Sequence, residues 1–141
     1  MAKEIRLDVA ILGGGFAGIY CAKQLERELG RESSVKVGLI SEENHMVFQP
    51  MLPEVVSASV SPRHVVNPIR LLCPRTHVYK GNVEEIHWPE RKLIFNGGDF
   101  LGRVEVRYER LVLALGSVVD LSRVPGMPEH AFLMRNVGDA M

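Results

Sequence analysis

The sequence predicts an α/β protein built around a mainly parallel sheet, and three neighbouring features carry this prediction. A short apolar run at 9–12 leads directly into glycines at positions 13, 15 and 18. An amphipathic stretch at 16–29 follows and has the periodicity of a helix. A second apolar run at 35–40 then completes a β-α-β unit, whose parallel strands require a right-handed crossover.

The glycines have the spacing G-x-G-x-x-G between a strand and a helix, where a dinucleotide pyrophosphate can rest on the helix N-terminus. Gly13 permits the tight turn, and Gly15 lets the pyrophosphate approach the backbone. Gly18 allows close packing of the helix on the strand. The motif therefore indicates a Rossmann-like nucleotide-binding unit.

The helix at 16–29 has an apolar stripe, and its residues are Ile19, Ala22, Leu25 and Leu29. Gly30 is a natural stop after it. The prolines and serines within 41–67 predict an irregular excursion with short helical turns. Asn67 and Pro68 are predicted to be the N-cap and first-turn proline of a short helix that extends through Leu72.

The second half of the sequence alternates strand-like runs and turns. Residues 76–80 predict a third strand, and 83–108 predict a three-stranded antiparallel meander that crosses over to the next parallel strand. The continuous apolar run at 111–115 is typical of a central parallel strand buried on both faces. We expect a domain at 1–120 and a linker at 121–141.

Composition excludes several functional classes. The chain has 141 residues, enough for one domain with a core, and its 17 basic and 17 acidic residues give no excess that favours nucleic acid. Its apolar runs are too short to span a bilayer, and its first residues lack a signal-peptide core. The histidines lack ligand spacing, so we expect no metal site. Cys21 and Cys73 lie in no recognisable motif, which fits a cytoplasmic protein.

An acidic residue at the end of the second strand usually binds a ribose hydroxyl of the dinucleotide. Here that end reads Ser41-Glu42-Glu43. Glu42 could accept two hydroxyl hydrogen bonds and Ser41 one, whereas Glu43 is equally well explained as part of a solvated loop. No arginine is present at this position, so a 2′-phosphate is disfavoured.

The order of these elements resembles the FAD domain of flavoproteins with two dinucleotide-binding domains. Residues 108–117, Tyr-Glu-Arg-Leu-Val-Leu-Ala-Leu-Gly-Ser, are similar to the Tyr-Asp-x-Leu-Val-x-Ala-Thr-Gly segment of that superfamily. The segment Phe48-Gln49-Pro50 resembles the Phe-Gln-Pro loop of type II NADH dehydrogenases, which are NADH:quinone oxidoreductases. Sulfide:quinone oxidoreductases share much of this layout. The predicted fold is thus a partial FAD-binding domain.

The resemblance implies a set of FAD-binding residues. They are Gly13, Gly14, Gly15, Phe16, Ala17, Gly18, Ser41, Glu42, Pro50, Val83, Ala114, Gly116 and Ser117. The glycine loop would face the pyrophosphate, with backbone amides of Phe16 and Ala17, while the backbone of Val83 would read the adenine edge. Pro50 would lie near the flavin ring. Ser41 stands where the family usually has the acidic ribose ligand.

For an intact protein, the resemblance implies that NADH reduces FAD and that FAD passes electrons to a quinone at the cytoplasmic face of a membrane. It assigns no catalytic side chain to these residues. The sequence has no second glycine motif for an NADH domain, so we expect an N-terminal fragment or truncated gene product that is not catalytic alone. The alternatives are a sulfide:quinone oxidoreductase-like flavoprotein and a non-catalytic nucleotide-binding module.

Overall fold

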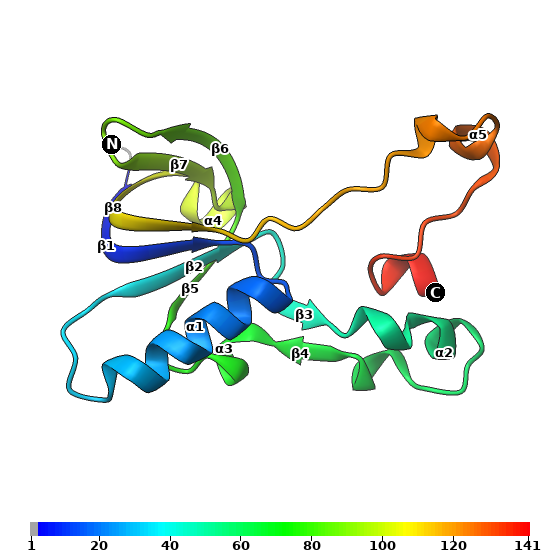
Figure 1. The fold of residues 1–141 in the computed structure, drawn as a ribbon, viewed down its shortest axis with the longest axis horizontal. Helices are drawn as coiled ribbons and strands as arrows, with labels where there is room; N and C mark the ends of the chain where they lie inside the picture. Colours follow the sequence, from blue (N-terminus) through cyan, green and yellow to red (C-terminus); the bar gives the residue numbers. More distant parts are fainter. Residues whose placement is uncertain (1–2) are drawn as a thin grey trace. The chain divides into compact units, whose positions relative to one another are not determined.

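The structure is a computed structural model that describes residues 3–141, and Figure 1 traces its elements. The described chain divides into two compact units. The first contains the residues up to 46 together with 68–115, and the second contains 47–67 together with 116–141. Each unit has its own apolar cluster, so each is described separately below.

The first unit is organised around a six-stranded sheet in the order β5-β2-β1-β8-β7-β6 (Figure 1). The strands are β1 (Lys3–Leu12), β2 (Val37–Ser41), β5 (His77–Lys80), β6 (Asn82–His87), β7 (Lys92–Asn96) and β8 (Arg103–Leu113). The strand β1 runs parallel to both β2 and β8, and β2 runs parallel to β5. The predicted mainly parallel α/β architecture is therefore confirmed.

Helix α1 (Phe16–Leu29) packs on this sheet and confirms the predicted amphipathic stripe. Ile19 and Ala22 are fully buried against the apolar cluster that contains Ile11. The helix ends at Gly30, whose φ of 69° is a left-handed conformation that favours glycine.

The predicted antiparallel meander is also confirmed, because β6 pairs antiparallel with β7 and β7 with β8. Leu93 and Phe95 of β7 are buried against Val104 and Val106 of β8, which gives the meander its own apolar face. The segment between β7 and β8 contains a single helical turn, α4 (Gly98–Leu101), where the sequence indicated only a turn.

One prediction about β8 is wrong. The meander strand and the apolar run form a single strand, and the run at 111–115 is not buried on both faces. Leu113 is 53% exposed and Leu115 is 63% exposed. The pairing of β7 with β8 ends at Arg107, so the last residues of β8 pair only with β1 among the described strands. An unpaired strand edge leaves these side chains accessible to solvent.

The excursion after β2 is irregular, as predicted. It contains β3 (His45–Val47), η1 (Gln49–Met51), α2 (Leu52–Val56), η2 (Pro62–His64) and β4 (Val66–Pro68), with β3 and β4 forming a two-stranded sheet. Helix α3 (Ile69–Leu72) follows.

The predicted cap of α3 is wrong. Pro68, not Asn67, occupies the N-cap position, and Asn67 lies within β4. A residue before proline is disfavoured in the helical region, which keeps Asn67 extended. The amide of Ile69 instead donates to the carbonyl oxygen of Asn44 at 3.0 Å.

The second unit has a small apolar cluster built from two distant parts of the sequence. Leu52, Val55 and Val65 are buried, and Val137 and Ala140 pack against them. The remaining elements of this unit are η3 (Leu121–Arg123), α5 (Met127–His130) and η4 (Gly138–Ala140). The C-terminal segment is therefore held by packing against the excursion that contains α2.

Candidate functional site

The loop between β1 and α1 is fixed by its neighbours. The amide of Gly13 donates to the carbonyl oxygen of Ile40 at 2.9 Å, which ties the loop to β2. Gly13 has a φ of 110°, a conformation that L side chains rarely adopt. A Cβ atom at this position would lie 2.1 Å from the carbonyl oxygen of Ala114, so the loop also contacts the end of β8. Only glycine fits this turn.

Two further glycines of the loop are packed tightly, and one is not. A Cβ at Gly18 would lie 1.9 Å from the carbonyl oxygen of Gly13, and a Cβ at Gly14 would lie 2.4 Å from Oγ of Ser41. Gly15 has an ordinary φ of −82°, and a Cβ there would meet no described atom within 4 Å. The backbone at Gly15 thus borders open space, whereas Gly13, Gly14 and Gly18 pack closely against neighbouring residues.

The open position lies at the N-terminus of α1, a helix of 14 residues with Gly15 at its N-cap. The first turn of α1 carries no acidic side chain, and the cap residue offers no side-chain hydrogen bond. The partial positive charge of the helix N-terminus is therefore not offset by these residues, which favours an anion beside Gly15. The geometry suits a pyrophosphate.

The end of β2 lies next to the loop, through the contact between Ser41 and Gly14. The carbonyl oxygen of Ser41 accepts a hydrogen bond from the amide of Gly81 at 2.8 Å. Glu42 is exposed immediately after the strand, while Oε2 of Glu43 lies 3.8 Å from Nζ of Lys80. The ion pair accounts for Glu43, and ribose binding by Ser41 and Glu42 stays a prediction.

The other predicted cofactor residues fall in both units. Val83 in β6 is half-buried against the apolar cluster of the meander, and the amide of Ala114 donates to the carbonyl oxygen of Leu12 at 2.8 Å. Pro50, Gly116 and Ser117 belong to the second unit and are exposed. Phe16 and Ala17 lie in the first turn of α1. Their roles toward FAD stay predictions.

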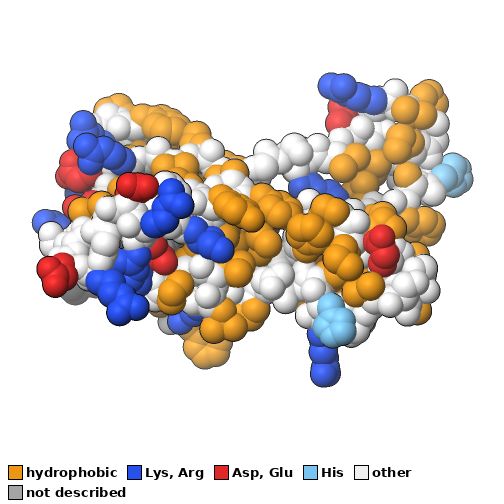
Figure 2. All heavy atoms as spheres, turned by 60° about the horizontal axis from the view of Figure 1, so that its bottom comes forward, with side chains coloured by type: hydrophobic (Ala, Val, Ile, Leu, Met, Phe, Trp, Pro, Cys, Tyr) orange, Lys and Arg blue, Asp and Glu red, His pale blue; other side chains and the backbone are white. Residues whose placement is uncertain are grey.

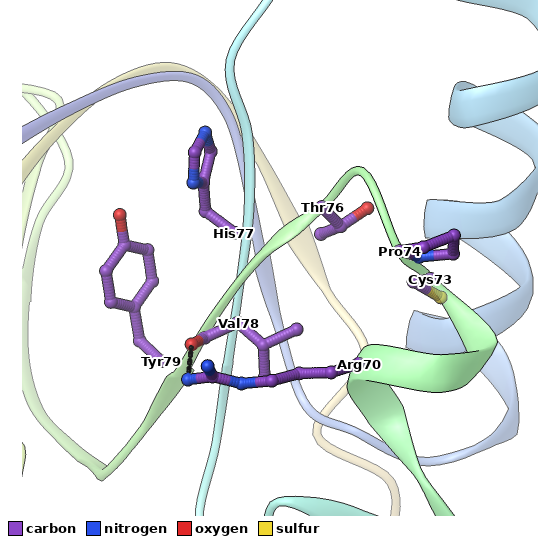
Figure 3. Close-up of a pocket in the computed structure, with 7 residues that line it drawn as sticks. All are labelled: Arg70, Cys73, Pro74, Thr76, His77, Val78 and Tyr79. Atoms are coloured by element: carbon purple, nitrogen blue, oxygen red, sulfur yellow. Dashed lines mark hydrogen bonds between the residues drawn. The ribbon is translucent and has the colours of Figure 1, made fainter.

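A hollow of about 300 Å³ lies beside α3 and β5, and Figure 3 shows its lining. Arg70 reaches from α3 and donates to the carbonyl oxygen of Val78 at 3.1 Å, while His77 and Tyr79 project from the same side of β5. None of the predicted cofactor residues lines this hollow.

Cys73 is part of this lining, and its thiol is a weak nucleophile. Burial, together with the nearby charge of Glu26, raises the pKa of its thiol from 9.0 to about 11, against a smaller opposing effect of Lys23. The Cys73 thiol lies 3.7 Å from the carbonyl oxygen of Ile19, to which it donates. A thiol with this pKa stays protonated at neutral pH and is a poor nucleophile.

Figure 2 shows basic and acidic side chains intermixed over the first unit on the face drawn there. The described residues include no group of His, Cys, Asp and Glu suited to hold a metal ion. None of the described helices is long and apolar enough to cross a bilayer.

A glycine loop between a parallel strand and a helix, bordered by the ends of β2 and β8, defines the class of this protein as an α/β nucleotide-binding domain. The chain belongs to the pyridine nucleotide-disulphide oxidoreductase family, whose family model matches residues 7–141.

Individual relatives agree with the resemblance to type II NADH dehydrogenases. An external alternative NAD(P)H-ubiquinone oxidoreductase B3 of Arabidopsis thaliana is 32% identical over 98% of this chain and 24% of its own length. The type II NADH:quinone oxidoreductase Ndh of Mycobacterium tuberculosis is 28% identical over 94% of this chain and 28% of its own length. The NDH2 structure from Plasmodium falciparum matches 99% of this chain and 27% of its own with a TM-score of 0.79 at 19% identity, which shows the shared fold. The chain thus spans about a quarter of these relatives.

Proposed function

We propose that this chain is the FAD-binding part of an oxidoreductase that passes electrons from NADH through FAD to a quinone. The observation that carries the proposal is the open space at Gly15, where a Cβ would meet no described atom within 4 Å while Gly13, Gly14 and Gly18 are tightly packed. Gly15 has neither a positive φ nor a close neighbour that would require glycine, so the fold alone does not explain a glycine at this position. A bound pyrophosphate at the N-terminus of α1 explains it.

In this proposal the residues of the chain bind and orient the cofactor. The backbone of the glycine loop receives the pyrophosphate, and Ser41 and Glu42, at the end of β2, accept hydrogen bonds from the ribose hydroxyls. A bound flavin would supply the redox chemistry, hydride acceptance and electron transfer, while the residues of this chain would hold and orient it. In this proposal the backbone of Val83 would contact the adenine, and Pro50 would contact the flavin ring.

NADH, the quinone and the membrane belong to the proposal for the whole protein. Relatives that carry NAD(P)H and quinone in their names support it, although this chain spans only about a quarter of their length. We infer that the intact protein acts peripherally at the cytoplasmic face of a membrane, and that this chain alone binds FAD without completing the reaction.

The sulfide:quinone alternative would need reactive cysteines. Cys73 is fully buried with a raised pKa, and Cys21 is half-buried within α1 beside the same apolar cluster. The curated relatives carry NAD(P)H and quinone in their names, so we favour the NADH:quinone function. The alternative of a non-catalytic nucleotide-binding module is distinguished from the NADH:quinone function by which cofactor the chain binds.

The test is titration of the full 141-residue chain with FAD, followed by flavin fluorescence. We expect saturable binding by the wild type and a loss of at least roughly tenfold in affinity for Gly15→Ala, because its methyl group enters the space needed by the pyrophosphate. Gln24→Ala, on the exposed side of α1, is the control and should bind as the wild type does. Equal affinity of Gly15→Ala and wild type, or no binding by the wild type, would overturn the proposal.

A further inference from the structure

Arg135 joins three segments of the second unit. Its guanidinium donates to the carbonyl oxygen of Ser117, and its own carbonyl oxygen accepts a hydrogen bond from Nε2 of Gln49 at 2.9 Å. Its backbone amide donates to Oδ2 of Asp139 at 2.7 Å. These partners are 86, 18 and 4 residues away in the sequence, so Arg135 connects parts of the chain that are distant in sequence.

The segment that carries Arg135 is itself held in place. Oδ2 of Asp139 also accepts the amide of Asn136 at 3.0 Å, and Oδ1 of Asn136 accepts the amide of Asp139 at 2.9 Å. This reciprocal pair has the form of a capping box at the start of a helical turn. Val137 and Ala140, on the same turn, pack against the apolar cluster beneath α2. The turn is therefore anchored on both its polar and its apolar sides.

Two of the partners of Arg135 adjoin proposed cofactor residues. Gln49 directly precedes Pro50 in η1, the residue expected beside the flavin ring, and Ser117 is itself one of the residues that the resemblance implies for FAD binding. Gln49 and Ser117 are exposed, whereas Arg135 is half-buried between them in the second unit. Without this link, each exposed segment would lose a long-range hydrogen bond and gain conformational freedom.

We propose that Arg135 is a positioning residue of the cofactor site, which holds the loop at Pro50 and the segment at Ser117 in a single arrangement. This inference rests on the proposed function, because it assumes that Pro50 and Ser117 contact FAD. Its guanidinium acts on the backbone of Ser117 and its carbonyl oxygen on the side chain of Gln49, so the effect of Arg135 falls on the part of the ligand that these segments contact and not on the adenosine end.

The planar guanidinium suits this position better than an ammonium does. It presents several N–H donors in fixed directions on a stiff plane, so it can reach the Ser117 carbonyl from a half-buried position. A lysine keeps the charge and N–H donors but not their fixed planar arrangement, which makes Arg135→Lys the conservative variant. Methionine keeps an unbranched apolar side chain and removes the donors, which makes Arg135→Met the variant that tests the link.

The experiment compares two ligands on the full chain. FAD binding is followed by fluorescence and by the visible flavin absorbance, and AMP, which has only the adenosine monophosphate end, is followed by ligand-observed NMR. We expect Arg135→Met to weaken FAD binding about tenfold and to shift the flavin absorbance, because one hydrogen bond of about 1–1.5 kcal/mol is lost. AMP binding should stay at the wild-type level, and Arg135→Lys should recover part of the FAD affinity.

Arg123→Met is the matched control. Arg123 lies in the same unit, its side chain is 83% exposed, and it pairs with Asp120 at 3.3 Å, away from the three partners of Arg135. This variant should bind both ligands as the wild type does. If Arg135→Met does not fold, Gln49→Leu tests the other end of the link and should give the same selective loss of FAD.

The outcomes separate the two proposals. Wild-type FAD affinity and an unshifted spectrum in Arg135→Met, or an equal loss of FAD and AMP, would overturn the role of Arg135 and leave the proposed function standing. Absence of FAD binding by the wild type would overturn the proposed function first, and this inference with it. Selective loss of FAD by Arg135→Met and Gln49→Leu, with Arg123→Met unaffected, would support both.

Discussion

Glu26 in α1 accepts two hydrogen bonds from Thr76, one from the backbone amide and one from the hydroxyl, both at 2.8 Å. The same carboxylate oxygen accepts the amide of Arg75 at 2.9 Å. The side chain of Glu26 is only 11% exposed, and Thr76 is buried. A single carboxylate thus fixes the loop that leads into β5 against the helix that follows the glycine motif.

Replacing Glu26 with alanine should destabilise the chain by roughly 2 kcal/mol. The amides of Arg75 and Thr76 would lose a charged acceptor in a partly buried place, and hydrogen bonds to charged groups are worth more than neutral ones. Urea unfolding followed by circular dichroism gives the free energy of unfolding. Glu28→Ala is the control, since Glu28 lies in the same helix with its side chain 65% exposed. Equal effects of both variants would contradict the role of Glu26.

Gly15 and Gly18 should differ sharply in the stability that replacement by alanine costs. Gly18→Ala should cost roughly 2–4 kcal/mol, because its Cβ would lie 1.9 Å from a backbone oxygen that cannot move without disturbing the turn. Gly15→Ala should cost less than about 1 kcal/mol, because its Cβ meets no described atom within 4 Å. Thermal unfolding without ligand measures both. A Gly18→Ala variant as stable as Gly15→Ala would show that the loop packs differently.

Local patterns predicted the helix after the glycine motif well because their causes are local. The stripe of Ile19 and Ala22 needs only helical periodicity, and Gly30 needs only its freedom at positive φ. The extent of β8 is not local. The polar residues Glu109 and Arg110 separate the alternating run at 103–108 from the apolar run at 111–115, and pairing along β1 joins the two runs into one strand.

The candidate site likewise combines features with local causes and features that depend on contacts distant in sequence. The glycine motif predicted the loop, because close backbone packing needs glycine at fixed spacing. The link between Gln49 and Arg135 spans 86 residues, and no spacing rule indicates it. A local signal for part of it was present, since Asn136 and Asp139 have the positions of a capping box at a helix start.

Replacing Tyr108 with phenylalanine should stabilise the chain by about 1 kcal/mol. Among the described residues, the Tyr108 hydroxyl is a buried side-chain oxygen without a hydrogen-bond partner, and burial raises its pKa despite the opposing charge of Arg91. Removing an unpaired buried hydroxyl removes a desolvation cost. Chemical denaturation measures the change, with Tyr20→Phe, at a residue 63% exposed, as the control. A loss of stability would instead mean that the hydroxyl is paired in solution, for example with a water molecule.

The raised pKa of Cys73 should make the chain less stable in alkaline solution. Its thiol titrates near 9.0 when exposed and at about 11 in the folded chain, so the folded state binds this proton more tightly. Its contribution to stability is therefore complete below pH 9 and decreases as the pH rises toward 11, by up to about 1.4 kcal/mol per pH unit. Urea unfolding at a series of pH values, for the wild type and for Cys73→Ala, measures this dependence.

Comparing the two chains isolates the thiol. Burial also raises the pKa values of Tyr79 and Tyr108, and these tyrosines reduce stability at high pH in both chains. The wild type should therefore lose stability more steeply than Cys73→Ala between pH 9 and 11, and the two curves should run parallel at lower pH. Parallel curves across the whole range would mean that Cys73 titrates normally, and that water reaches its thiol in the folded chain.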